Sequence, residues 1–338
     1  MRLLDRIAKC REPTALLGRS GEASLRVTGP ADFAAAVRDC PVRYVLADDL
    51  TEECSELAFA GGDRFAACLD PIRIPAPLLW IEWADGVQQD VLSATGLISH
   101  KDPAASRRRV GVLIRSSPCG ACGTVRTFWG VAGDTTVTLA PIETQIDLSG
   151  DFPRDPLGED VLAGGTVRLR DPVEPVRNVL FDCARFRFDR RWAAAYRSMV
   201  RTPGDLDSVL RGSVGSVARD IPLLFALFLL LNARSAMHPV PADLSALNRK
   251  RRRTGKVPLL DHLQLHSALG DAVGPRRCAE QAATDRRAAR LHHVRAHLVR
   301  RENNVFWRRA HLRGMASFGT VRSRNVHLSV GGRDQPQR

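Results

Sequence analysis

Short apolar runs alternate with Gly, Pro and Asp breaks through the middle of this chain. The runs are Pro77–Trp83, Arg109–Arg115, Thr124–Val131, Thr135–Leu139 and Thr166–Leu169. Runs of this length, separated by turn-forming residues, are typical of strands. Short connections favour antiparallel pairing, because parallel neighbours need a long crossover. We therefore expect residues 71–185 to form a β-rich region with an antiparallel sheet.

Helical patterns flank this region. Ala31–Cys40 and Leu46–Ala60 predict helices within a mainly helical segment over residues 1–70. Farther along, Trp192, Tyr196 and Met199 recur at helical spacing, which is typical of a stripe of core residues. These patterns predict a helical layer over residues 186–246.

Ile221–Leu231 is the longest apolar run and predicts a buried helix. Asp220 stands at the expected N-cap and Pro222 in the first turn. The run is shorter than the roughly 20 residues that cross a bilayer. The charged N-terminal sequence does not resemble a signal peptide. These features predict a cytoplasmic protein with no membrane partner.

The patterns together predict an α+β fold. It comprises the helical segment 1–70, the β-rich region 71–185, the helical layer 186–246 and a basic C-terminal region 247–330, and all four regions are compatible with a single domain. The chain has 338 residues, of which 44% are hydrophobic. A chain of this size and composition buries a sizeable core, which excludes a wholly disordered protein.

Positive charge is concentrated at one end of the chain. Residues 248–338 contain 21 Lys and Arg against 6 Asp and Glu, whereas the whole chain has a formal net charge of +13. The preceding residues are thus close to neutral. A basic segment on a neutral body is typical of a surface that binds a polyanion.

The first basic cluster follows Asn248. Its cations are candidate nucleic-acid contacts: Arg249, Lys250, Arg251, Arg252, Arg253 and Lys256. Thr254-Gly255-Lys256 is not a phosphate loop, because the earlier glycine is missing and Val257 replaces the magnesium-binding hydroxyl. A solvated helix end is the alternative interpretation of this cluster.

The second basic cluster predicts a hairpin around a turn near Asn303. In the predicted register Arg295 lies opposite His311 and His297 lies opposite Arg309. One face then collects His293, Arg295, His297, Arg309, His311 and Arg313. Arg295, Arg309 and Arg313 are candidate phosphate contacts. His293, His297 and His311 are candidate catalytic residues for metal-independent RNA cleavage. A merely soluble sheet face is the third possibility.

Other chemical groups support weaker hypotheses. Cys119 and Cys122 have the spacing of two zinc ligands, but no second pair follows, so we expect a plain turn. His262 and His266 stand i, i+4 on a helix or alternate on a strand, without an evident third ligand. We expect the acidic residues of 48–56 to form a solvated helix face. Glu82, between Trp80 and Trp83, is expected at the sheet rim, paired with an arginine. No metal or cofactor is expected.

Two stretches of the basic region carry a resemblance. Leu-Asn-Arg-x-Arg with Gly-Lys-x-Pro-Leu spans Leu247–Leu260, and His-x-Val-Arg-x-His-x-x-Arg and Trp-x-Arg-x-His-x-Arg-Gly follow it. This combination resembles a family of phage and prophage proteins that includes type V-A anti-CRISPR proteins. Ala296 and Ala310 stand where the family usually has glycine and proline.

The resemblance implies a function at RNA. The type V-A anti-CRISPR members of this family are understood to prevent production of the Cas12a effector by recognising its nascent N-terminal peptide and provoking destruction of its message. We therefore expect a phage-derived anti-defence protein that acts at RNA or a translating ribonucleoprotein. A nascent CRISPR effector polypeptide is a further expected partner. A metal-independent ribonuclease and a packaging protein with a nucleic-acid-binding face remain alternatives.

Overall fold

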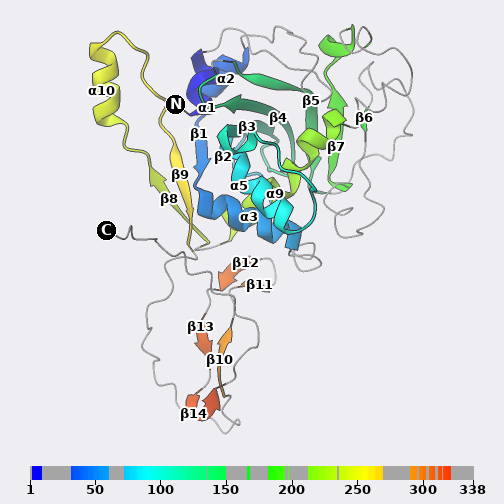
Figure 1. The fold of residues 1–338 in the computed structure, drawn as a ribbon, viewed down its shortest axis with the longest axis vertical. Coiled ribbons are helices and arrows are strands. Elements are labelled where there is room, and N and C mark those ends of the chain that lie inside the picture. Colours follow the sequence, from blue (N-terminus) through cyan, green and yellow to red (C-terminus); the bar gives the residue numbers. More distant parts are fainter. Residues whose placement is uncertain are drawn as a thin grey trace, which may run out of the picture. The chain divides into compact units, whose positions relative to one another are not determined.

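The computed structural model describes residues 2–9, 32–60, 72–134, 136–149, 166–167, 182–194, 197, 212–233 and 236–268, together with strands between residues 290 and 320. These residues form a mixed α/β fold (Figure 1). By its internal contacts the chain divides into a first unit, residues 1–268 with 300–306, and a second unit, residues 269–299 with 307–338.

The first unit is built on a nine-stranded sheet with the order β6-β7-β5-β4-β3-β2-β1-β9-β8. The strands are β1 (Val42–Leu46), β2 (Leu78–Ala84), β3 (Arg108–Ser116), β4 (Cys122–Val131), β5 (Thr138–Asp147), β6 (Thr166–Val167), β7 (Ala184–Phe188), β8 (Met237–Pro241) and β9 (Leu263–Ser267). Strands β2 to β7 pair antiparallel, which confirms the antiparallel middle of the chain.

The complete sheet is mixed because of β1. This strand pairs in parallel with β2 on one side and with β9 on the other, and β8 completes the edge antiparallel to β9. Strand β1 was not predicted and lies inside the segment expected to be mainly helical. Residues 247–268 were assigned to the basic C-terminal region, and the pairing of β9 with β1 joins the end of this stretch to the sheet.

The helices of the first unit are α1 (Leu3–Lys9), α2 (Asp32–Asp39), α3 (Asp48–Ala60), α5 (Asp85–Ala94), α9 (Asp220–Asn232) and α10 (Ser245–Arg253), with 3-10 turns η1 (Ala105–Arg107) and η3 (Arg190–Trp192). Helices α2 and α3 confirm the predictions over Ala31–Cys40 and Leu46–Ala60. Helix α5 was not predicted and interrupts the β-rich region directly after β2.

The two faces of β2 are buried under different helices. On one face the Phe128 ring of β4 lies 5.9 Å from the Trp80 ring and 5.6 Å from the Phe33 ring of α2. A Cβ atom at Gly111 would lie 2.4 Å from the Trp80 indole, so only glycine lets this indole lie across β3. Helices α1 and α2 therefore cover the Trp80 face.

The opposite face carries Trp83. Its indole Nε1 donates to Gln88 Oε1 of α5 at 3.0 Å, and Gln88 Nε2 donates to the carbonyl of Arg219 at 3.0 Å. Helix α3 contacts both α5 and α9, and Figure 1 shows these three helices grouped over the sheet. The central strands of the sheet are therefore covered on both faces.

The apolar helix predicted from Ile221 is present and extends farther back than expected. Helix α9 continues a helical run that begins at Gly212, with a turn at Arg219, and the run Gly212–Asn232 has a mean hydropathy of 1.9 over an 18-residue window, which would suit a membrane span by length and composition. In the fold 78% of that window is buried, as in a core helix. The predicted N-cap is wrong: Arg219 has helical dihedral angles, φ −61° and ψ −21°, so Asp220 lies within the helical run.

Glu82 is paired with an arginine, as predicted, but it does not lie at the sheet rim. Strand β2 is internal, and Glu82 is completely buried. Its Oε1 accepts from Arg109 Nε at 2.5 Å, and its two oxygens accept from the backbone N–H groups of Leu3 and Leu4, each at 3.0 Å. Glu82 therefore fixes the start of α1 to the sheet, where a negative charge also favours the helix dipole.

Candidate nucleic-acid interface

The first predicted basic cluster lies on an excursion between the edge strand β8 and its neighbour β9. The excursion comprises residues 242–262 and contains α10, which Figure 1 shows beyond the ends of these strands. At its start, Asp243 Oδ1 accepts from the N–H of Ser245 at 3.1 Å and from the Ser245 hydroxyl at 2.5 Å. Asp243 precedes the N-cap residue Leu244, and its carboxylate satisfies one of the free N–H groups of the first turn.

The end of α10 is a Schellman motif. The N–H of Gly255 donates to the carbonyl of Arg252 at 3.1 Å, and the N–H of Lys256 donates to the carbonyl of Arg251 at 2.8 Å. Gly255 has φ +67°, the left-handed conformation that this motif requires. The Gly255-Lys256 pair is therefore a helix terminator, in agreement with its exclusion as a phosphate loop.

Two side chains on the inner side of α10 hold the chain that returns from it. Asn248 Nδ2 donates to the carbonyl of Leu259 at 3.0 Å, and Asn248 Oδ1 accepts from the N–H of Leu259 at 2.7 Å. Arg251 Nε donates to the carbonyl of Val257 at 2.7 Å. Asn248 and Arg251 therefore serve the shape of the excursion, and Arg251 is half-buried rather than a free phosphate contact.

The remaining cations of the cluster are exposed. We call them the basic face: Arg249, Lys250, Arg252, Arg253 and Lys256. Arg249, Arg252 and Arg253 are spaced i, i+3 and i+4, so they fall on one side of α10. No carboxylate among the described residues lies within 4.0 Å of any of these cations. Neighbouring like charges destabilise a helix, and a bound polyanion would remove this repulsion.

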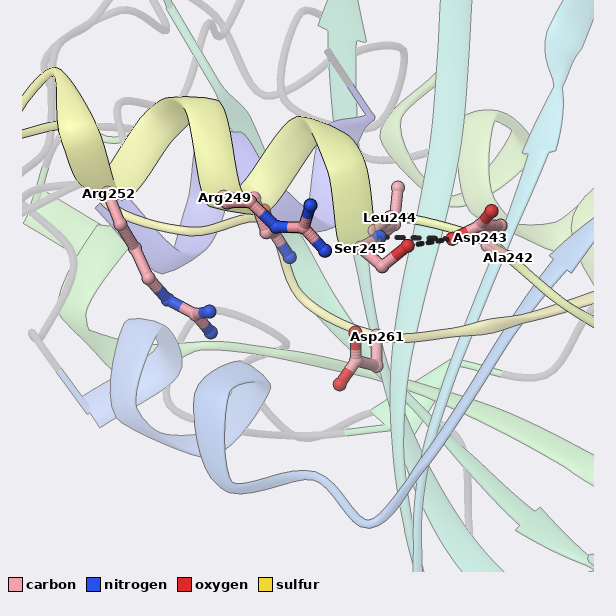
Figure 2. A pocket seen from close by; sticks show the side chains of 8 residues that line it. Ala242, Asp243, Leu244, Ser245, Arg249, Arg252 and Asp261 are labelled. Atoms are coloured by element: carbon pink, nitrogen blue, oxygen red, sulfur yellow. Dashed lines mark hydrogen bonds between the residues drawn. The ribbon is translucent and has the colours of Figure 1, made fainter.

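A surface pocket of about 420 Å³ opens beside the first turns of α10 (Figure 2). Its lining includes Arg249 and Arg252 of the basic face and the aspartates Asp243 and Asp261. Neither aspartate was predicted to belong to the site. Pro241 of β8 pairs with Leu263 of β9, and Asp243 and Asp261 each lie two residues beyond this pair. The antiparallel register therefore brings both aspartates to the same end of the two strands.

The second basic cluster forms short strands, described here by their backbone pairing. These are β10 (Arg290–Val294), β11 (His297–Arg301), β12 (Asn304–Arg308), β13 (His311–Arg313) and β14 (Met315–Thr320). Strand β11 pairs with β12, on either side of the predicted turn, and β10 lies between β13 and β14. The predicted hairpin is thus divided between two ladders.

The register of the β10–β13 ladder differs from the prediction by one residue. His293 pairs with Leu312 and Val294 with His311, whereas the prediction paired Val294 with Leu312. Residues that pair directly share a face of the ladder, and successive residues along a strand alternate between faces, so a one-residue shift in register changes which residues of the two strands share a face. His293 is therefore not at a position that shares a face with His311 and Arg313. Arg295 and Arg309 lie outside the described residues.

The cysteine and histidine pairs considered as metal ligands lie in a turn and along a strand. Cys119 and Cys122 lie at the turn between β3 and β4, both exposed and unbridged, as expected for a plain turn. His266 lies in β9 and His262 just before it, so the strand alternative is right and the helical pair is wrong. Among the described residues no three His, Cys, Asp or Glu side chains are arranged to hold a metal ion.

The acidic residues of α3 are only partly a solvated face. Asp48, Asp49, Glu52 and Glu56 are exposed. Glu53 instead contacts the Ser267 hydroxyl of β9, and burial raises the pKa of Glu53 to about 7. This contact helps to fix α3 against the sheet edge that carries the excursion.

Comparison of the chain with protein-family models, curated proteins and solved structures gave no match.

Proposed function

We propose that this protein binds RNA through the basic face of α10. Five exposed cations without carboxylate partners among the described residues carry this proposal. The excursion is fixed at the start of α10 by Asp243, at its end by Gly255 and along its inner side by Asn248. Because the backbone that carries these cations is held in place before binding, only their side chains lose conformational entropy when phosphates bind.

We further propose a phage-derived anti-defence role, in which RNA binding at a message or a translating ribonucleoprotein suppresses production of a CRISPR effector. The resemblance of Leu247–Leu260 to the anti-CRISPR family supports this role. Two residues of that motif, Asn248 and Gly255, shape the excursion, and most of its basic residues face solvent. A motif in which some residues fix the backbone while others expose positive charge is suited to binding a large anion.

Binding without cleavage is favoured over a ribonuclease. Metal-independent cleavage requires a general base and a general acid at one phosphate, and the predicted site assigned both roles to histidines. The β10–β13 register pairs His293 with Leu312 and not with a residue on the face of His311. The proposal therefore depends on the basic face of α10 and not on His293, His297 or His311.

Salt-dependent binding of single-stranded RNA tests the interface. The affinity of the full chain is measured by fluorescence anisotropy between about 50 and 200 mM salt. The variant replaces Arg249, Lys250, Arg252 and Arg253 with Gln and keeps Arg251, which is structural. Each lost phosphate contact lowers the slope of log affinity against log salt by about 0.7, so we expect a slope reduced by about 3.

A matched control removes the same charge elsewhere. Arg73, Lys101, Arg115 and Arg190 are exposed on the body of the first unit, and their replacement with Gln has the same effect on net charge. The control variant should keep nearly the slope of the unsubstituted protein. Equal slopes for the two variants would show that only overall charge matters and would refute the proposed interface.

The biological role is tested by transcript levels. A type V-A effector transcript and an unrelated transcript are measured in bacteria that express the protein or the α10 variant. A selective fall of the effector transcript, absent with the variant, supports the anti-defence role. Loss of both transcripts indicates a general ribonuclease, and loss of neither favours the packaging alternative.

A further inference from the structure

The pocket beside α10 has opposite charges on facing walls. Figure 2 shows the side chains of Arg249 and Arg252 leaving α10 on the side of Asp261. Yet no ion pair within 4.0 Å joins either arginine to Asp243 or Asp261. The pocket therefore offers guanidinium donors and carboxylate acceptors that do not neutralise each other.

The two aspartates are not equivalent. Asp243 already accepts two hydrogen bonds from Ser245, which lower the pKa of its carboxyl group. The Asp261 carboxylate is exposed and accepts from no donor among the described residues. Asp261 is thus the acceptor in this pocket that a ligand can use without breaking a bond of the fold.

Both walls of the pocket are anchored. Behind Asp261, the N–H of Leu260 donates to Asp5 Oδ1 at 2.8 Å, and Arg43 Nη1 donates to the carbonyl of Asp261 at 3.3 Å. On the other wall, the bonds of Asn248 to Leu259 hold α10 at a fixed distance from the same segment. The separation between the arginines and Asp261 is therefore set by the backbone.

We propose that this pocket binds one guanine nucleotide of the RNA held by the basic face. Arg249 and Arg252 bind its phosphate, and Asp261 binds the base. The inference rests on the proposed RNA binding and adds base specificity to it. A volume of about 420 Å³ lies within the range of small-ligand pockets, which is about 300–1,000 Å³.

The choice of guanine follows from the donors that each base presents. Guanine has two adjacent donors, N1–H and the N2 amino group, and a carboxylate accepts from both at once. Adenine and cytosine place a ring acceptor beside their amino group, and uracil places its single N–H between two carbonyl acceptors. Each of these acceptors would face an oxygen of Asp261, so the other bases bind less well.

The test compares short oligouridines that carry a single central guanosine, adenosine or cytidine. Binding to the full chain is measured by fluorescence anisotropy at constant salt. We expect about tenfold tighter binding of the guanosine oligomer, the usual size of one bidentate base contact. Equal affinity for the three oligomers would overturn the pocket proposal and leave RNA binding intact, whereas no binding of any oligomer would overturn both.

Asp261→Asn provides the specific variant. Its amide combines one acceptor with one donor, so it no longer accepts from both guanine donors, and it matches the amino group and ring nitrogen of adenine and of cytosine. We expect the preference for guanosine to be lost. Asp39→Asn removes an equal charge from the exposed end of α2 and should keep the guanosine preference. An unchanged preference in Asp261→Asn would refute the role of Asp261.

A competition experiment separates RNA from a free nucleotide. Guanosine monophosphate lacks the neighbouring phosphates that the basic face would hold, so it should displace the guanosine oligomer only at much higher concentration. If guanosine monophosphate displaces the labelled oligomer at the same concentration as the unlabelled guanosine oligomer does, the pocket binds a free nucleotide and the RNA proposal is overturned.

Discussion

Asn248 and Leu259 exchange two hydrogen bonds across the turn that returns the chain from α10 to β9, at 2.7 and 3.0 Å. Asn248 is only 7% exposed, so water does not readily replace these bonds. In Asn248→Ala both backbone groups of Leu259 lose their partner, which costs about 1–3 kcal/mol in local stability. We expect hydrogen exchange of the Leu259 amide to accelerate by roughly ten- to a hundredfold.

The neighbouring Leu247→Ala is the control for this prediction. Leu247 is 46% exposed, and its side chain makes no polar contact. Exchange at Leu259 should stay nearly unchanged in Leu247→Ala, and RNA affinity should fall only in Asn248→Ala. Equal exchange rates in the two variants would mean that Asn248 does not hold the excursion.

Gly255 is predicted to tolerate other residues poorly, for conformational and not for steric reasons. No atom lies within 4 Å of a Cβ built at Gly255, but its φ of +67° costs an L-residue about 1–2 kcal/mol. Gly255→Ala should therefore speed hydrogen exchange at Lys256, whose N–H bonds to Arg251. Gly255→Asn should have a smaller effect, because asparagine adopts this conformation more readily.

Gly215→Ala should stabilise the protein, in contrast to Gly255→Ala. Gly215 lies within the helix Gly212–Asn232, has no positive φ, and a Cβ there would also meet nothing within 4 Å. Alanine in a helix interior is more favourable than glycine by about 1 kcal/mol. We expect a higher urea midpoint for Gly215→Ala, and a lower midpoint would contradict the conformational argument.

The fold was predictable where local patterns decide it. The apolar runs of β2 and β3 and the alanine-rich α2 were identified because their side chains repeat with the period of the element. Strand β1 was missed because it pairs with β9, which is more than 200 residues away, and no local pattern reports such a pair. Helix α5 was missed because Asp85-Gly86 resembles the start of a turn.

The positive charge of the site could be predicted from the sequence, but the spatial arrangement of its residues could not. The basic residues of 249–256 are evident in composition, and Gly255 could have been read as a helix terminator. The role of Arg251 depends on the position of the Val257 carbonyl, which follows only from the folded turn. Asp243 and Asp261 are brought together by the β8–β9 register, so neither is a candidate in the sequence alone.

Glu82→Gln should be strongly destabilising. Glu82 is completely buried and binds Arg109 and the N–H groups of Leu3 and Leu4. Loss of its charge leaves the Arg109 guanidinium without its counterion, which typically costs about 3–5 kcal/mol. Urea unfolding measures the loss. Glu52→Gln, an exposed change on α3, should stay within about 0.5 kcal/mol of the unsubstituted protein.

A double variant separates the ion pair from the packing around it. Combining Glu82→Gln with Arg109→Met removes both charges, so the double variant should be more stable than Glu82→Gln alone. If the two losses simply add, the effect of Glu82 comes from its bonds to α1 and not from Arg109.

Asp220 should make the stability of the first unit depend on pH. It is 1% exposed, and burial raises its pKa to about 7, with Asp85 acting in the same direction and Arg219 opposing it. Between pH about 4 and 7 the folded protein holds a proton that the unfolded chain has released. Stability therefore falls as the pH rises through this window, by an amount on the order of a few kcal/mol.

Asp220→Asn isolates this contribution. The variant has no carboxyl group to ionise at position 220. As the pH rises from 5 to 8, the free energy of unfolding of the variant should therefore increase relative to that of the unsubstituted protein. Glu53, whose pKa is also raised to about 7, titrates in the same sense but in both proteins, so it cancels in the difference. Asp39→Asn, at an exposed position, should show no such change between the two pH values. A difference between the unsubstituted protein and Asp220→Asn that is constant with pH would mean that Asp220 ionises normally in the fold.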